Sequence, residues 1–285
     1  MIRKKGTTIL LVLILLIGSS LLLYPTVSDR WNAYHQSRMI ISHAENVANL
    51  SEEECETLLS AAADFNKTLV GNGGRWTLTD EEKQTYKSLL ISDSTEIMAY
   101  VEIPKIKISL PVYHGTDNSV LQEAIGHLEG SSLPVGGKGT HCVLSGHRGL
   151  PSARLFTDLV ELSEGDVFML YTLNEVLTYE VDQIRTVLPT DMSTLEIDPE
   201  QDYCTLFTCT PYGVNTHRLM IRGHRIETEK DYTVPVTAEA LQIDEVLVAL
   251  VISVPLLVLI FVITLSIPRK KKTTASMALR REHMT

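Results

Sequence analysis

The sequence predicts a mainly β domain of the barrel or sandwich class, preceded by helices and flanked by two membrane-spanning helices. Three observations support this prediction. Short β-type runs separated by turn residues fill residues 97–227, a helical pattern covers residues 29–70, and an uncharged apolar run lies near each end of the chain. Seven or eight short strands over about 130 residues are typical of a compact barrel or sandwich.

The first apolar run, Thr7–Tyr24, has eighteen residues without a charge and follows three basic residues. At ~1.5 Å per helical residue it is about long enough to cross the hydrocarbon of a bilayer. The alternative is a cleaved signal peptide, but the run is longer than a usual signal core and no A-x-A site follows it. We therefore expect an uncleaved signal anchor and a short basic tail within residues 1–28.

The second apolar run, Val246–Ile267, has twenty-two residues without a charge and precedes a basic segment. Pro255 lies inside it, and membrane helices tolerate proline better than soluble helices do. We expect a transmembrane helix within residues 244–268 and a cytoplasmic tail over residues 269–285. Because basic flanks favour the cytoplasm, the two spans predict a two-pass plasma-membrane protein with both termini inside and the middle region outside.

The region between the spans is acidic, with 16 Lys and Arg against 34 Asp and Glu, a net charge of about −18. Such a surface repels nucleic acid, so no nucleic-acid partner is expected, and the charge is explained by solubility.

Residues 29–96 are predicted to form an external helical region followed by a loop. Ser51 with Glu54 is a capping box that starts a second helix, and Thr79 with Glu82 starts a short third one. The three glycines between them, in "VGNGGRW", predict a mobile surface loop.

The predicted catalytic domain, residues 97–243, begins where the pattern changes to strands. Seven runs fit strands: "IMAYVEIP", "ISLPVYHG", "HCVLSGH", "DVFMLYTL", "VLTYEVDQIRTVLP", "YCTLFTCTP" and "HRLMIRGHRIE". Two helical patches, Ser119–Ile125 and Leu155–Leu162, interrupt them.

Four cysteines, Cys55, Cys142, Cys204 and Cys209, lie in the region expected outside the cell. An even number there is compatible with disulfides. Cys204 and Cys209 are five apart on one predicted strand and should face opposite sides, so we do not expect them to pair. A disulfide among the other three stays open, although a domain of this size can fold without one.

Three residues at predicted strand ends suit acyl-transfer chemistry: His147, Cys209 and Arg218. A nearby cation favours a nucleophilic thiolate, and histidine can serve as that cation and as the proton donor to a leaving amine. Arginine offers permanently charged donors to a tetrahedral oxyanion. Each also has an ordinary alternative: a small buried cysteine, a surface histidine, and an arginine paired with an acid.

Three segments closely resemble the sortases, the cysteine transpeptidases of the Gram-positive cell surface. They are "TLFTCTPYGVNTHRLMIRGHR", "HLEGSSLPVGGKGTHCVLSGHRGLPSARLF" and "YVEIPKIKISLPVYHGT". The resemblance extends over residues 97–227 and is strongest to class C, the pilus-assembling sortases. It implies a closed, roughly eight-stranded β-barrel that needs no metal or organic cofactor.

The resemblance also implies a role for each candidate residue. Cys209 attacks the Thr–Gly bond of an LPxTG-like sorting signal and forms a thioester, and the acyl group then passes to an amine such as a pilin lysine. His147 corresponds to the general acid/base, and Arg218 to the oxyanion-binding arginine. Class C enzymes commonly have a lid with an Asp-Pro-aromatic motif; here the equivalent is Gly74-Arg75-Trp76. Trp76 is therefore the lid candidate, and the acid that would engage Arg218 is missing.

Three alternative functions can be compared with this pattern. The chain could attach surface proteins to a peptidoglycan precursor, with the same three residues and a different amine, or act mainly as a hydrolase. It could be a catalytically silent, membrane-tethered scaffold, although a scaffold has no need for all three residues. A papain-type protease needs its histidine downstream of the cysteine, whereas His147 lies upstream of Cys209.

Overall fold

The computed structural model describes residues 2–92 and 96–228, together with Val258 and Phe261. The predicted second span, Val246–Ile267, therefore lies outside the described residues except at these two helical positions. The chain divides into two compact units, residues 1–21 with 241–285 and residues 22–240, and the second unit contains the folded domain.

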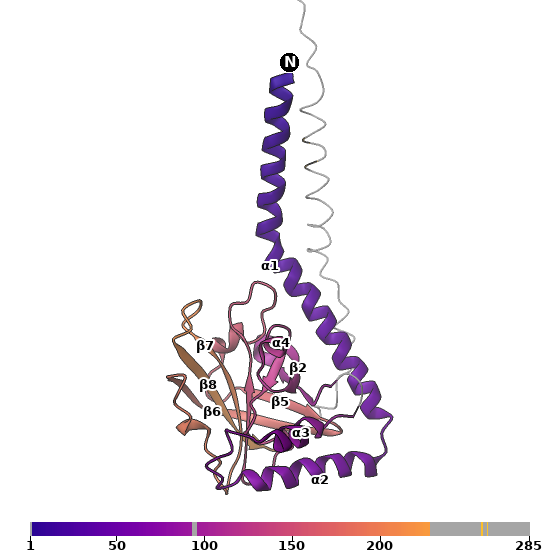
Figure 1. Ribbon diagram of the computed structural model, residues 1–285, viewed down its shortest axis with the longest axis vertical. Helices are drawn as coiled ribbons and strands as arrows, with labels where there is room; N and C mark the ends of the chain where they lie inside the picture. The colour runs from indigo at the N-terminus through magenta and orange to yellow at the C-terminus, as the bar shows by residue number, and fades with distance from the viewer. Residues whose placement is uncertain (1, 93–95, 229–257, 259–260, 262–285) are drawn as a thin grey trace, which may run out of the picture. The chain divides into compact units, whose positions relative to one another are not determined.

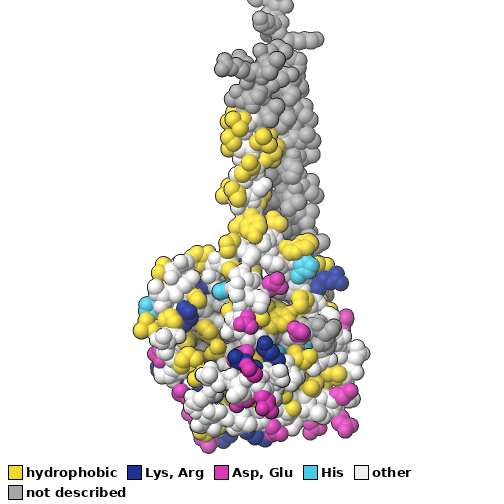
Figure 2. Space-filling view, viewed as in Figure 1, with side chains coloured by type: hydrophobic (Ala, Val, Ile, Leu, Met, Phe, Trp, Pro, Cys, Tyr) yellow, Lys and Arg dark blue, Asp and Glu magenta, His cyan; other side chains and the backbone are white. Residues whose placement is uncertain are grey.

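The first helix, α1 (Ile2–Ala48), contains the whole N-terminal apolar run and the first part, residues 29–48, of the predicted helical region that follows it. One helix thus continues through the expected boundary at residue 28. Its segment Leu10–Ala48 is the one helix in the described part of the chain that is long and apolar enough to cross a membrane. Figure 2 shows yellow apolar side chains exposed along this helix, which is consistent with membrane anchoring.

Eight strands form a closed barrel in the order β1-β2-β3-β4-β7-β8-β6-β5, as expected for the class (Figure 1). The pairs β2–β3 and β4–β7 are parallel, and the remaining pairs are antiparallel. The bounds are β1 Ala99–Ile103, β2 Ile108–His114, β3 Ile125–His127, β4 Thr140–Ser145, β5 Val167–Thr172, β6 Glu175–Val187, β7 Asp202–Thr210 and β8 His217–Ile226.

All seven predicted runs contain a strand, but β3 was not predicted. It falls where the predicted helical patch Ser119–Ile125 ends, and the helix found there, α4, covers only Asn118–Leu121. The reason is physical: β3 has three residues and all of them are buried, so it shows no alternation that could distinguish a strand. The second patch contains the short 3-10 helix η2 (Thr157–Glu161), and two further ones are η1 (Pro104–Ile106) and η3 (Ser193–Leu195).

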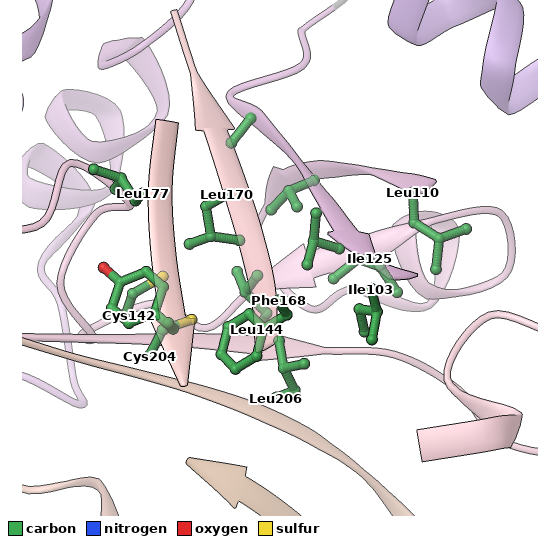
Figure 3. Packing of buried hydrophobic residues seen from close by; sticks show 14 of the residues in the cluster. Ile103, Leu110, Ile125, Cys142, Leu144, Phe168, Leu170, Leu177, Cys204 and Leu206 are labelled. Atoms are coloured by element: carbon green, nitrogen blue, oxygen red, sulfur yellow. The ribbon is translucent and has the colours of Figure 1, made fainter. Parts of the chain in front are cut away.

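The barrel interior is filled by one apolar cluster. Each strand except β3 contributes at least two residues to it, and β3 contributes Ile125. Figure 3 shows Leu144 of β4, Leu206 of β7 and Phe168 of β5 converging there. Gly223 of β8 permits a close approach of this kind, since a Cβ at this position would lie 2.8 Å from the Phe168 ring.

Two further helices pack on the barrel, α2 (Glu52–Leu69) and α3 (Asp80–Ser88), and both predicted capping boxes are present. Asn66 of α2 donates to the carbonyl oxygen of Leu133 (3.0 Å) and accepts from its N–H (2.7 Å). Tyr86 of α3 is fully buried, and its hydroxyl lies 2.8 Å from Nδ1 of His127. These buried polar contacts fix the helices to the domain, and they give His127 a structural role.

Candidate active site

Cys209 and Arg218 face each other at the turn end of the β7–β8 hairpin. They are direct register partners in the antiparallel pair, and both are half-buried. The exposed turn between them is closed by hydrogen bonds from Val214 and Asn215 N–H to the Pro211 carbonyl (3.1 and 3.0 Å). Opposed residues in such a pair have Cβ atoms about 5 Å apart, so the thiol and the guanidinium stem share one small site.

The guanidinium of Arg218 is held by the turn backbone. Its Nη1 donates to the carbonyl oxygens of Asn215 (3.2 Å) and His217 (3.1 Å). Among the described residues no carboxylate forms an ion pair with Arg218. Its charge is therefore available to an oxyanion at the mouth of the hairpin.

His147 reaches this site from β4, the parallel neighbour of β7. Ser145 pairs with Phe207, and the ladder continues beyond the strand because Gly146 N–H donates to the Phe207 carbonyl (3.2 Å). The Thr208 hydroxyl also donates to the Gly146 carbonyl (2.7 Å). His147 and Cys209 each lie two positions beyond the last residue pair, Ser145 and Phe207. Because neighbouring strands lie about 4.8 Å apart, the two residues are carried by adjacent strand ends.

Two features fix the segment that carries His147. A Cβ on Gly146 would lie 2.6 Å from Cδ1 of Ile125 and 2.7 Å from the Phe156 ring, so only glycine lets the backbone pack this closely on the core. The His147 carbonyl also accepts a hydrogen bond from Phe156 N–H (3.1 Å). Partial burial lowers the pKa of the His147 imidazole, which favours its neutral form at pH 7.

The loop after Cys209 and the loop after His147 are clasped together by Arg148 and Tyr212. Arg148 Nη1 donates to the Thr210 hydroxyl (3.2 Å), and its guanidinium carbon lies 5.8 Å from the centre of the Tyr212 ring. Gly149, at φ +82°, allows the ring to approach, since a Cβ there would lie 2.9 Å from it. Sequence reasoning missed Arg148, because an arginine after a candidate histidine carries no signal of its partner 62 residues away.

A second apolar cluster, here called the outer-face cluster, lies outside the barrel beside these residues. Phe207 and Met220 are register partners, two positions from Cys209 and Arg218 and therefore on the same sheet face. The cluster comprises the buried Val143, Leu195 and Met220 and the partly buried Trp76, Leu128, Val187, Met192 and Phe207. It gives the candidate site an apolar neighbour.

Trp76, the lid candidate, packs against the outer-face cluster, and the loop that carries it is anchored. Arg75 is only 3% exposed and donates to the carbonyl oxygens of Gly130 and Leu195, both at 2.9 Å. Its guanidinium stacks 4.0 Å over the Trp76 ring, and Glu196 lies 3.5 Å away. The expectation of a mobile surface loop is thus corrected at Arg75: a buried cation with two carbonyl partners ties down a glycine-rich segment.

A groove lies elsewhere on the domain. It has a volume of about 760 Å³, runs between α1 and β2, and is lined by residues that include Gln36, Ile40 and Leu110. Cys209, His147 and Arg218 do not line it. Chemistry points instead to the turn end of the hairpin, because adjacent strand ends carry a thiol, an imidazole and a guanidinium there.

Comparison with known proteins gives a consistent family. A family model described as the sortase domain matches residues 101–226. Sortase D of Bacillus subtilis strain 168 is 31% identical over 151 residues, which are 52% of this chain and 72% of that protein. Crystal structures of class C sortases are similar over the folded domain. Sortase C1 from Streptococcus agalactiae is 52% identical with a TM-score of 0.66, covering 67% of this chain and all of that one. Sortase C of Streptococcus pneumoniae is 41% identical with a TM-score of 0.58, covering 66% and 97%.

Proposed function

Because this chain belongs to the sortase family of cysteine transpeptidases, we propose that it polymerises pilins. It cleaves an LPxTG-like sorting signal between Thr and Gly and transfers the new acyl group to a lysine amine of a neighbouring pilin. The observation that carries the proposal is the Cys209–Arg218 register pair beside the strand end that bears His147. The similarity to sortase C of Streptococcus pneumoniae, whose substrates are described as pilins, supports a pilin as the acceptor.

In the first half-reaction Cys209 is the nucleophile. Its sulfur forms a bond to the threonine carbonyl carbon while His147 takes up the thiol proton. The oxyanion of the tetrahedral intermediate accepts hydrogen bonds from Arg218. The intermediate collapses when His147 returns the proton to the glycine nitrogen, the C–N bond breaks, and a thioester remains on Cys209.

In the second half-reaction the neutral lysine amine attacks the thioester carbonyl. The C–N isopeptide bond forms and the C–S bond breaks, with the amine proton passing to His147 and then to the departing Cys209 sulfur. The lowered pKa of His147 suits this exchange, because a neutral imidazole can accept a proton in either direction of the cycle. The contacts of Arg148 with Thr210 and Tyr212 act indirectly, because they hold the loop after His147 against the loop after Cys209.

The outer-face cluster suits the leucine and proline side chains of a sorting signal. Trp76 covers part of that surface, so an incoming signal has to share it with the indole ring or displace it. The lid proposed here thus acts through apolar packing on the cluster, with Arg75 as its anchor, and needs no acid on Arg218.

The domain works on the outer face of the plasma membrane in this proposal, with both termini in the cytoplasm. The exposed apolar helix α1 supports the N-terminal anchor. The second span rests on the uncharged run Val246–Ile267 and the basic residues after it.

The test of the acceptor uses the full chain in detergent micelles with an LPxTG peptide. One sample receives a lysine-bearing pilin domain, one a peptidoglycan-like amine, and one water alone, and mass spectrometry measures the products. The proposal expects an isopeptide on the pilin lysine that is absent from Cys209→Ala. Transfer only to the peptidoglycan-like amine or to water would favour cell-wall anchoring or hydrolysis, and no product with any peptide would favour the silent scaffold.

The lid is tested separately with Trp76→Ala. Removing the indole uncovers the cluster, so peptide cleavage and alkylation of Cys209 by a thiol reagent should both become faster. An exposed valine of the catalytic hairpin turn, changed as Val214→Ala, is the matched control for loss of an apolar side chain. If both rates in Trp76→Ala equalled those of the unchanged chain, the lid proposal would be abandoned.

A further inference from the structure

Two of the four cysteines are direct neighbours inside the barrel. Cys142 of β4 and Cys204 of β7 are register partners in the parallel pair. Both belong to the core cluster, with exposures of 2% and 0%. Side chains alternate between the two faces of a strand, so Cys209, five positions after Cys204 on β7, lies on the opposite face and apart from this pair.

The backbone spacing of the pair suits a disulfide. Neighbouring strands lie about 4.8 Å apart, within the Cα separation of roughly 4.4–6.8 Å that disulfides span. Figure 3 shows the two side chains together in one part of the core. The structure describes both as free thiols, which is the reduced state of this arrangement.

The two thiols also differ in acidity. Burial raises the pKa of the Cys142 thiol, but hydrogen bonds with Cys204 and His127 outweigh burial and lower it. Burial raises the pKa of Cys204 well above its usual value. This difference belongs to the closed barrel; before the barrel closes, the thiolate of either cysteine can start thiol–disulfide exchange.

We propose that Cys142 and Cys204 form an intramolecular disulfide when the chain folds in a thiol-oxidising compartment. The oxidant is another disulfide, either a small molecule or an oxidoreductase. The thiolate of one cysteine attacks it and expels one thiolate, giving a mixed disulfide; the other cysteine then attacks the sulfur of the first and expels the second thiolate. Two protons and two electrons leave the pair, and the oxidant becomes two thiols. Its relevance in the cell rests on the external location in the proposed function.

Such a bond would link β4 and β7 covalently, the two strands that lead to His147 and Cys209. His147 lies five positions after Cys142, and Cys209 five positions after Cys204. The cysteines are 62 positions apart, so a link between them restricts the unfolded chain strongly. Because both side chains are buried, exchange has to occur before the barrel closes.

The test uses the full chain, unfolded in guanidinium chloride and refolded in detergent with a mixture of reduced and oxidised glutathione. Remaining thiols are alkylated, and peptides are identified by mass spectrometry without reductant. The expected result is a cross-linked peptide pair joining Cys142 to Cys204, with Cys55 and Cys209 alkylated. Recovery of all four cysteines as free thiols or glutathione adducts, or a link to Cys55 or Cys209, would overturn the proposal.

Thermal unfolding gives a second readout with matched controls. The cross-linked chain should unfold at a temperature higher by about 10 °C than the chain refolded with reductant. The difference should vanish in Cys142→Ala and in Cys204→Ala and persist in Cys55→Ala; its persistence in the first two would count against the proposal. Acylation of Cys209 is measured separately, so failure of the transpeptidase proposal leaves this test intact.

Discussion

Replacing Arg75 by alanine should loosen the Trp76 loop and destabilise the domain at the same time. The guanidinium is 3% exposed and donates to two carbonyl oxygens at 2.9 Å, from Gly130 and Leu195. Hydrogen bonds that involve a charged group contribute roughly 1.5–3 kcal/mol each, and stacking on Trp76 adds about 0.5–2 kcal/mol. Water can reach part of the emptied site, so we expect a loss of about 3 kcal/mol, slightly below the sum of the low values.

The assay is thermal and urea unfolding of the full chain in detergent, followed by fluorescence. For a domain of this size, about 3 kcal/mol corresponds to a fall of roughly 6–12 °C in Tm. The matched control is Lys138→Ala, which removes a cation whose ion pair with Glu200 is exposed (side-chain exposures 77% and 75%) and should change stability by less than about 0.5 kcal/mol.

Two results would refute this reasoning. If Arg75→Ala were as stable as Lys138→Ala, the two carbonyl contacts would not anchor the loop. If stability fell but peptide cleavage did not accelerate, Arg75 would be a structural residue only, and the loop would not restrict access to the outer-face cluster.

Three other predictions follow from the structure: a pH–rate profile, a substitution and a pH–stability profile. The acidic limb of kcat/KM should have its midpoint below pH 6.5, because burial lowers the pKa of His147; a midpoint at or above 6.5 would contradict this. Gly146→Ala should lower the free energy of unfolding by about 1–3 kcal/mol and kcat/KM at least tenfold, since its Cβ would lie 2.6 Å from the core; equal kinetics would show that His147 tolerates displacement. Burial lowers the pKa of both His114 and His141 to about 4, so the folded state binds fewer protons than the unfolded state. Stability should therefore be complete above about pH 6.5 and fall by up to about 3 kcal/mol per histidine towards pH 4, measured by urea unfolding; a flat profile would be incompatible with neutral buried rings.

The sequence predicts those parts of the fold that local pattern controls. Each of the strands β4, β7 and β8 contains a short apolar run, such as the three residues Leu219–Ile221 of β8, and the capping boxes at Ser51 and Thr79 mark the starts of α2 and α3. The pairing of Cys209 with Arg218 follows from one hairpin, so their opposition is also predictable from local sequence.

Contacts between distant segments are not predictable in this way. The parallel pairing that sets Cys142 against Cys204 joins strands 62 positions apart, and nothing in either strand indicates the register. Arg75 looks like a surface cation in a glycine-rich loop, yet its partners come from residues 130 and 195. The same limit applies to Arg148, whose role depends on Thr210 and Tyr212.

The most direct test of the central claim is the intact mass of the full chain after mixing with an LPxTG peptide. The account predicts an added acyl group that ends in threonine, lies on Cys209, and is released by hydroxylamine as a thioester. The adduct should be absent in Cys209→Ala and strongly reduced in His147→Ala and Arg218→Ala. An unmodified chain with every sorting peptide, in both the unchanged protein and Trp76→Ala, would contradict the assignment of Cys209 as the nucleophile.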